Sequence, residues 1–111
     1  MELYNEIENL VKQLQISVKK LRETGGDFAK AEMDYKMLLR EECLKLKDEK
    51  MAIGMIDKVC YGIPSVAKAR FKRDVAEAVW KANLESINAI KVEIRVLENQ
   101  LSREFGVDLN D

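Results

Sequence analysis

The sequence predicts an all-α protein, a long antiparallel helical hairpin that is coiled-coil-like and has a short helical corner. Three observations favour this fold. Charged residues make up 35% of the chain, while glycine and proline together number six, a composition typical of long helices. The hydrophobic content of 47% argues against a disordered chain, which is too polar to bury a core. Apolar residues also recur at helical spacing through two long stretches. A length of 111 residues suits a single domain, residues 1–111.

The first arm of the hairpin is expected at about residues 2–49. Its apolar face begins with Leu3, Ile7, Leu10, Leu14, Val18 and Leu21. The same steps of three and four continue through Gly25, Phe28, Glu32, Tyr35, Leu39, Cys43 and Leu46. The average step is close to the 3.6 residues of a helical turn. Because a loop would break this phase, we predict one helix that continues through Gly25 and Gly26, at a cost of about 2 kcal/mol relative to alanine. The alternative is a break at "TGGDF", with Asp27 as the N-cap of a second helix.

The corner is expected at about residues 50–63. Gly54, Gly62 and Pro64 interrupt the pattern here, and the "MIDKVCY" segment is long enough for about two helical turns. The second arm follows at about residues 64–105, with Pro64 at the first helical position, where proline is favoured. The tail, residues 106–111, is expected to be frayed.

The second arm carries two apolar faces. One face consists of Trp80, Leu84, Ile87, Ile90, Ile94, Leu97, Leu101 and Phe105. The opposite face, which we call the outer stripe, consists of Phe71, Val75, Ala78, Ala82, Ala89, Val92 and Val96. A helix that is apolar on two sides is buried on two sides, and the first arm can cover only one of them. The sequence therefore predicts a homo-oligomeric bundle in which the outer stripe contacts another copy.

The residue types present argue against an enzyme. The chain has no histidine, so the usual general base near neutral pH is missing. Cys43 and Cys60 are far apart in sequence and do not form a zinc motif, and a disulfide between them is possible without being indicated. No catalytic, metal or cofactor motif is found. Two thiols, a charged start without a targeting pattern and no long apolar run favour a cytoplasmic protein that does not enter a membrane.

A basic cluster at the start of the second arm is a candidate contact for an anion or a nucleic acid. It consists of Lys58, Lys68, Arg70, Lys72 and Arg73. A helix N-terminus already favours anions through its free N–H groups and its dipole. The alternative is solvated charge that pairs with acids of the first arm, such as Glu41, Glu42, Asp48 and Glu49.

An apolar tip at the corner is a candidate docking surface for a partner protein. It consists of Met51, Ile53, Met55, Ile56 and Tyr61, with Val59 beside them. Methionine-rich surfaces adapt to partners, although the same residues can simply close the open end of a hairpin. The residues that lead into "IPSVAKARFKRD" also show a weak helix-turn-helix pattern. Phe28, Tyr35 and Trp80 are expected in the core.

The segments "AKAEMDYKMLLREECLKLKDE" and "RFKRDVAEAVWKANLESINAIKVEIRVLENQLSREF" carry a family resemblance. Over roughly residues 27–105 the chain resembles an uncharacterised family of small helical proteins from phages and prophages of Gram-positive bacteria. Genes of this family tend to accompany replication and recombination genes. The resemblance implies an accessory role in the host cell cytoplasm and supplies no active-site residues.

Three functions are compatible with these features. The first is a non-enzymatic phage accessory protein that acts by protein–protein interaction, as a modulator or inhibitor of a host or phage factor. The second is a nucleic-acid-associated protein of phage replication or recombination. The third is an oligomeric sponge that binds a small anionic nucleotide. None of the three requires a cofactor.

Overall fold

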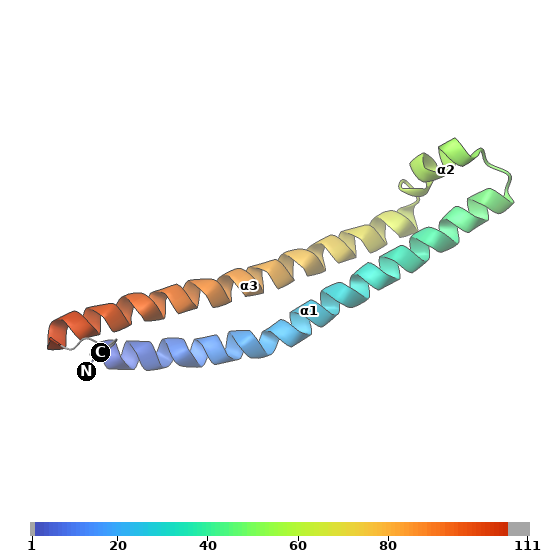
Figure 1. The fold of residues 1–111 in the computed structure, drawn as a ribbon. Coiled ribbons are helices and arrows are strands. Elements are labelled where there is room, and N and C mark those ends of the chain that lie inside the picture. Colours follow the sequence, from blue (N-terminus) through green and yellow to red (C-terminus); the bar gives the residue numbers. More distant parts are fainter. Residues whose placement is uncertain (1, 107–111) are drawn as a thin grey trace. The chain divides into compact units, whose positions relative to one another are not determined.

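The structure, a computed structural model, describes residues 2–106 and contains three helices in that range. They are α1 (Glu2–Asp48), α2 (Ile53–Cys60) and α3 (Pro64–Phe105), with no strand in the described range (Figure 1). The all-α prediction is therefore confirmed. The chain divides into two compact units. One contains the residues up to Glu23 together with those from Lys81 onward, and the other is Thr24–Trp80.

Helix α1 continues through Gly25 and Gly26, as the apolar phase predicts. Gly25 has a structural reason: a Cβ atom there would lie 3.4 Å from Trp80 Nε1, so a larger side chain would displace the indole. Gly26 faces open space, with nothing within 4 Å of such an atom. The packing of the apolar residues on either side of Gly25 and Gly26 therefore stabilises the helix in spite of the two glycines.

In the unit that contains Glu23 and Lys81, α1 and α3 run antiparallel. Ile87 and Ile90 of α3 are buried, and Asn83 Nδ2 donates a hydrogen bond of 3.0 Å to the backbone carbonyl of Ser17. This contact corrects the predicted face of α1, because Ser17 turns toward α3 while Val18 is exposed. A second correction concerns Phe105, which is exposed in the last turn of α3 although the pattern places it on the packed face.

The unit Thr24–Trp80 has its own core. It is built from the buried side chains Tyr35, Leu46, Ile56, Cys60 and Val66. Partly buried residues surround them, including Leu39, Cys43 and Met51. The rings of Phe28 and Trp80 stack at a centroid distance of 5.4 Å. The expectation that Phe28, Tyr35 and Trp80 pack internally is confirmed, because Tyr35 is buried and the other two are half-buried against each other.

The corner between α1 and α3 is made by backbone hydrogen bonds. The N–H of Met51 donates to the carbonyl of Leu46, and Lys50 takes a left-handed conformation with φ of 64°. Helix α3 begins at Pro64, and the carbonyl of Ile63 accepts the first helical hydrogen bond, from Ala67 N at 2.9 Å. At the other end, Gly106 with φ of 62° follows the last helical residue, as expected for a helix C-terminus. The rest of the predicted frayed tail, residues 107–111, lies outside the described residues.

Candidate interaction surfaces

The outer stripe of α3 is open to solvent throughout. Phe71 is 69% exposed and Val92 is 56% exposed, and the alanines between them are exposed as well. The opposite face of the same helix carries the buried Ile87 and Ile90. No part of residues 2–106 covers the outer stripe, so α3 has the two apolar faces that the sequence predicts, one packed and one exposed.

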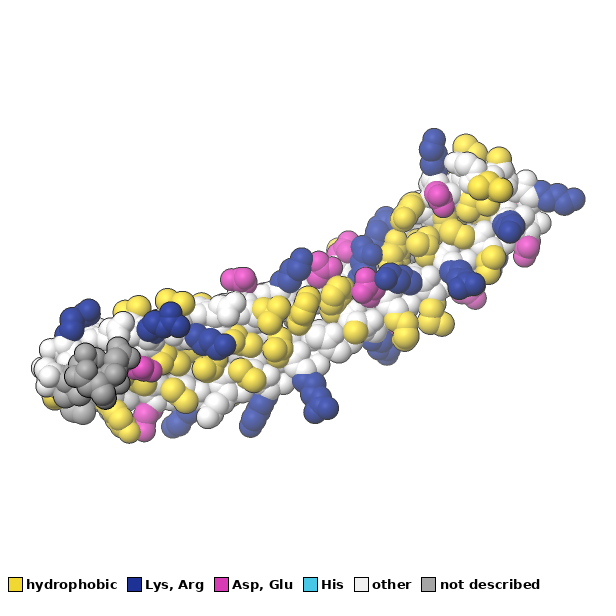
Figure 2. Space-filling view, viewed as in Figure 1, with side chains coloured by type: hydrophobic (Ala, Val, Ile, Leu, Met, Phe, Trp, Pro, Cys, Tyr) yellow, Lys and Arg dark blue, Asp and Glu magenta, His cyan; other side chains and the backbone are white. Residues whose placement is uncertain are grey.

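More large hydrophobic side chains are exposed than hydrophobic side chains are buried. Among residues 2–106, seventeen large hydrophobic side chains are exposed and seven hydrophobic side chains are buried. Figure 2 shows groups of hydrophobic side chains at the surface, with charged side chains between them. Single exposed apolar residues need no explanation, but aligned ones that form a patch indicate a binding surface.

Two shallow grooves adjoin the outer stripe, one in each unit. The first, of about 520 Å³, is lined by Leu10 of α1 and by Val92, Val96 and Leu97 of α3, with Glu6 and Glu93 at its edge. The second, of about 250 Å³, is lined by Phe71, Val75 and Val79 of α3, with Asp27 and Lys72 beside them. Both are mainly apolar and polar only at the margin, a pattern typical of surfaces that bind protein side chains.

The basic cluster is divided between half-buried side chains that have partners in the chain and exposed side chains. Arg70 donates a hydrogen bond of 3.2 Å to the carbonyl of Tyr61 and lies over the Tyr61 ring. Arg73 binds Asp74 Oδ1 through Nε and Nη2, at 3.1 and 2.9 Å, and lies over the Tyr35 ring at 4.6 Å. The contact with Asp74 raises the pKa of Arg73, which keeps its charge at any ordinary pH.

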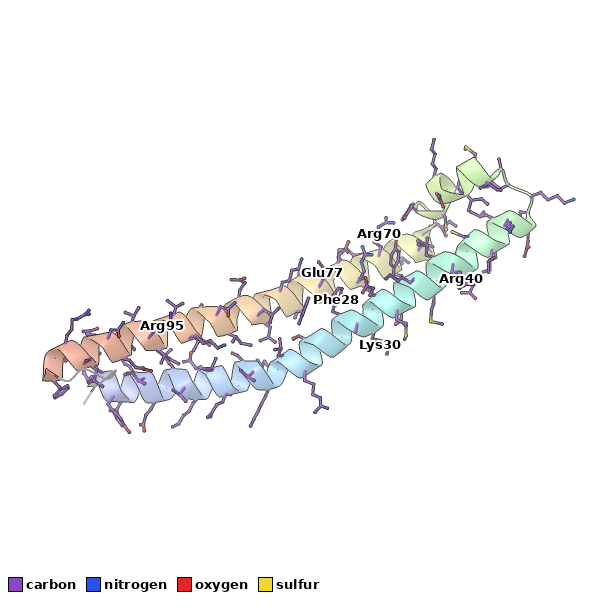
Figure 3. All side chains as sticks on the ribbon, in the orientation of Figure 1. Phe28, Lys30, Arg40, Arg70, Glu77 and Arg95 are labelled. Atoms are coloured by element: carbon purple, nitrogen blue, oxygen red, sulfur yellow. The ribbon has the colours of Figure 1, made fainter. Side chains whose placement is uncertain are left out.

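Lys58, Lys68 and Lys72 of the same cluster are exposed. Lys68 and Lys72 line a groove together with Lys30 of α1, and Asp27 and Asp34 line the same groove. Figure 3 labels Lys30 on α1 and Arg70 on α3. Two of the five predicted cations thus have structural partners, and the charge around the lysines is mixed in sign.

The predicted apolar tip likewise contains both packed and exposed side chains. Ile56 is buried and Met51 packs against the core, so these two close the end of the Thr24–Trp80 unit. Ile53 is 81% exposed, and Met55 and Tyr61 are also exposed. Together with Val59, which is 37% exposed, these three residues leave a smaller apolar surface on and beside α2.

One apolar surface is absent from the sequence-based predictions. Met33, Met37 and Leu44 are all exposed on α1. Steps of four and seven place them on one side of the helix, opposite the side that carries Tyr35 and Leu46. Their spacing was a signal in the sequence, but the stronger phase of the buried face masked it.

Cys43 and Cys60 meet in the core of the Thr24–Trp80 unit. Both thiols are free, and their sulfur atoms lie 3.1 Å apart. Cys60 has no exposed surface. Burial is the main cause that raises the pKa of Cys60 to about 11, and the hydrogen bond with Cys43 is the second. A buried thiol with a raised pKa is a poor nucleophile, because the thiolate is the reactive form.

No group of three or more potential metal ligands occurs within residues 2–106. In the same range, no helix combines the length and the apolar character needed to cross a bilayer. No family model, curated protein or solved structure matches the chain.

Proposed function

We propose that this chain is a non-enzymatic interaction protein that works as a homo-oligomer and binds a second protein. The observation that carries the proposal is the excess of aligned, exposed apolar side chains over buried ones. In this proposal the chain forms one long hairpin, and the outer stripe of α3 joins copies into a helical bundle. Burial of apolar area contributes about 25 cal/mol per Å², so covering rows of valines and phenylalanine stabilises the assembly.

The exposed apolar residues outside α3 are the proposed contacts of the second protein. They are Met33, Met37 and Leu44 on α1, and Ile53, Met55 and Tyr61 on and beside α2. Methionine is flexible and polarizable, so it suits surfaces that adapt to a partner. The resemblance to phage proteins supports a modulator or inhibitor of a host or phage factor, acting in the cytoplasm.

Light scattering tests the self-association. We expect a mass well above the 12.8 kDa of one chain at tens of micromolar protein. Val92→Glu should reduce the mass to that of one chain while helix content by circular dichroism stays unchanged, because a buried charge without a partner is costly. Lys91→Glu, which changes charge at an exposed neighbouring position, is the control. A wild-type protein that is monomeric at this concentration would contradict the proposal.

A pull-down tests the second partner. Tagged protein is incubated with nuclease-treated lysate of a Gram-positive bacterium, and wild type is compared with Met37→Glu and with Lys20→Glu as a charge control. We expect Met37→Glu alone to lose the captured protein. Equal capture by all three proteins would remove the α1 surface from the proposal.

Nucleic-acid binding is the second candidate function, carried by the exposed Lys58, Lys68 and Lys72. Phosphate contacts make log K fall by about 0.9 per contact as log salt rises on duplex DNA. The test is binding to random-sequence DNA at two salt concentrations. The absence of binding at low salt would exclude this function.

A sponge for an anionic nucleotide is the third candidate, at the groove lined by Lys30, Lys68 and Lys72. A thermal shift with cyclic nucleotides tests it, because a ligand that binds only the folded state raises the melting temperature. An unchanged melting temperature at millimolar ligand would exclude it.

A further inference from the structure

The exposed residues of the outer stripe follow the spacing of a coiled-coil seam. Starting at Phe71, steps of four and three alternate without error through positions 75, 78, 82, 85, 89, 92 and 96. This seven-residue repeat places the positions at a and d of successive heptads, the positions at which one helix packs into another. Glu85 is the single polar residue in this series of positions. The next position beyond each end of the series is also polar, Lys68 before Phe71 and Asn99 after Val96.

We propose that the occupant of this seam is α3 of a second copy, in antiparallel orientation, with a two-fold axis between residues 83 and 84. The inference rests on the proposed self-association and specifies its geometry. Three features of the seam bear on this register: the order of side-chain sizes is compatible with it, while the position of Glu85 and the charges that flank the stripe favour it over a parallel one.

The first feature is side-chain size. In the antiparallel register Phe71 lies opposite Val96 of the second copy, Val75 opposite Val92, and Ala78 opposite Ala89. Large side chains therefore meet at both ends of the seam and small ones meet near the axis. Matching layers allow the two helices to stay close along the contact without leaving cavities. A parallel dimer, in which identical residues meet, matches the sizes equally, so this feature is compatible with both orientations.

The second feature is Glu85. A parallel dimer in register would place two glutamates in the same core layer, where like charges repel and desolvation is costly. In the antiparallel register Glu85 lies opposite Ala82. The small alanine leaves space for the carboxylate to extend to solvent.

The third feature is the charge that flanks the seam. In an antiparallel coiled coil, e positions face e positions of the partner and g positions face g positions. This register pairs Lys72 with Glu93 and Asp74 with Arg95, each across the two helices, and both pairs are opposite in sign. All four side chains are exposed or half-exposed in one chain, and Figure 3 labels Arg95 on α3.

A parallel dimer offers no comparable pairs. There, each g position faces the e position of the next heptad, which brings Asp74 to Val79, Lys81 to Ser86, and Asn88 to Glu93. None of these combinations joins opposite charges. Flanking charges set the orientation of coiled coils, so they point to the antiparallel arrangement.

A charge-swap experiment tests the register. The dissociation constant is measured by analytical ultracentrifugation for wild type, Lys72→Glu, Glu93→Lys and the double variant. We expect each single change to weaken the dimer about tenfold, since it turns two symmetry-related attractions into repulsions. The double variant should return to within about threefold of wild type. Lys91→Glu, at an exposed position outside the a, d, e and g positions of the seam, is the matched control and should leave the constant unchanged.

Disulfide cross-linking gives a readout that does not depend on charge. Val75→Cys and Val92→Cys proteins are oxidised separately and as a mixture, with wild type as the control for the native thiols. We expect a covalent dimer only in the mixture, with the link between positions 75 and 92. A dimer of Val75→Cys linked to itself would overturn the antiparallel register and leave self-association standing. A monomeric wild type would overturn both.

Discussion

At the scale of single residues, the two thiols show how packing changes chemistry. Cys60 lies in the core, and its pKa is raised from 9.0 to about 11 by burial and by the hydrogen bond with Cys43. In the unfolded chain the pKa of the Cys60 thiol returns to its ordinary value. The neutral thiol is thus the form that the folded state stabilises.

The first prediction concerns pH. Because the folded pKa of Cys60 lies above the unfolded one, this contribution to stability is fully present below pH 9 and is lost as pH rises toward 11. Urea unfolding at several values in this range should show a falling free energy of unfolding. Cys60→Ala, with no thiol to ionise, should show a weaker dependence. Equal slopes for the two proteins would contradict the role of Cys60.

The second prediction concerns Lys50, whose φ of 64° is left-handed. Side chains other than glycine are strained there, so Lys50→Gly should raise the free energy of unfolding by about 0.5–1 kcal/mol. Lys47→Gly is the control, because it removes a side chain from within α1 and should lower stability by about 1 kcal/mol. Chemical denaturation measures both. A loss of stability in both variants would show that Lys50 is not strained.

At the scale of the helix, the two adjacent glycines of α1 behave differently. Gly26 faces open space and Gly25 faces Trp80. The third prediction is that Gly26→Ala stabilises the protein by about 0.5–1 kcal/mol, because alanine has the higher helix propensity. Gly25→Leu should destabilise it, since the side chain must displace the indole. Urea denaturation compares the two, and similar effects at both positions would contradict the packing described.

The helices also show what the sequence could and could not predict. The continuity of α1 was predictable because its apolar phase passes unbroken through the glycines, and Pro64 marked the start of α3. Val18 was misplaced because an apolar side chain was preferred over Ser17, whose backbone carbonyl meets Asn83. The meeting of Cys43 with Cys60, and the partners of Arg70 and Arg73, depend on the corner. Helical periodicity carries no information about that geometry.

At the scale of the whole molecule, the exposed apolar residues link stability to association. The fourth prediction is that the melting temperature rises with protein concentration, because assembly favours the folded state by mass action. Differential scanning calorimetry over a hundredfold concentration range measures the rise. Val92→Glu should remove the dependence. A melting temperature of wild type that stays constant over this range would argue against a folded oligomer.

The fluorescence of Trp80 offers a readout that distinguishes unfolding from dissociation. It is the only tryptophan in the chain, it stacks on Phe28, and its indole lies against Gly25. It is on the packed face of α3, away from the outer stripe. Its emission should therefore shift when the Thr24–Trp80 unit opens and stay constant when two copies meet. One intrinsic fluorophore can thus separate unfolding from dissociation in a single dilution series, without any added label.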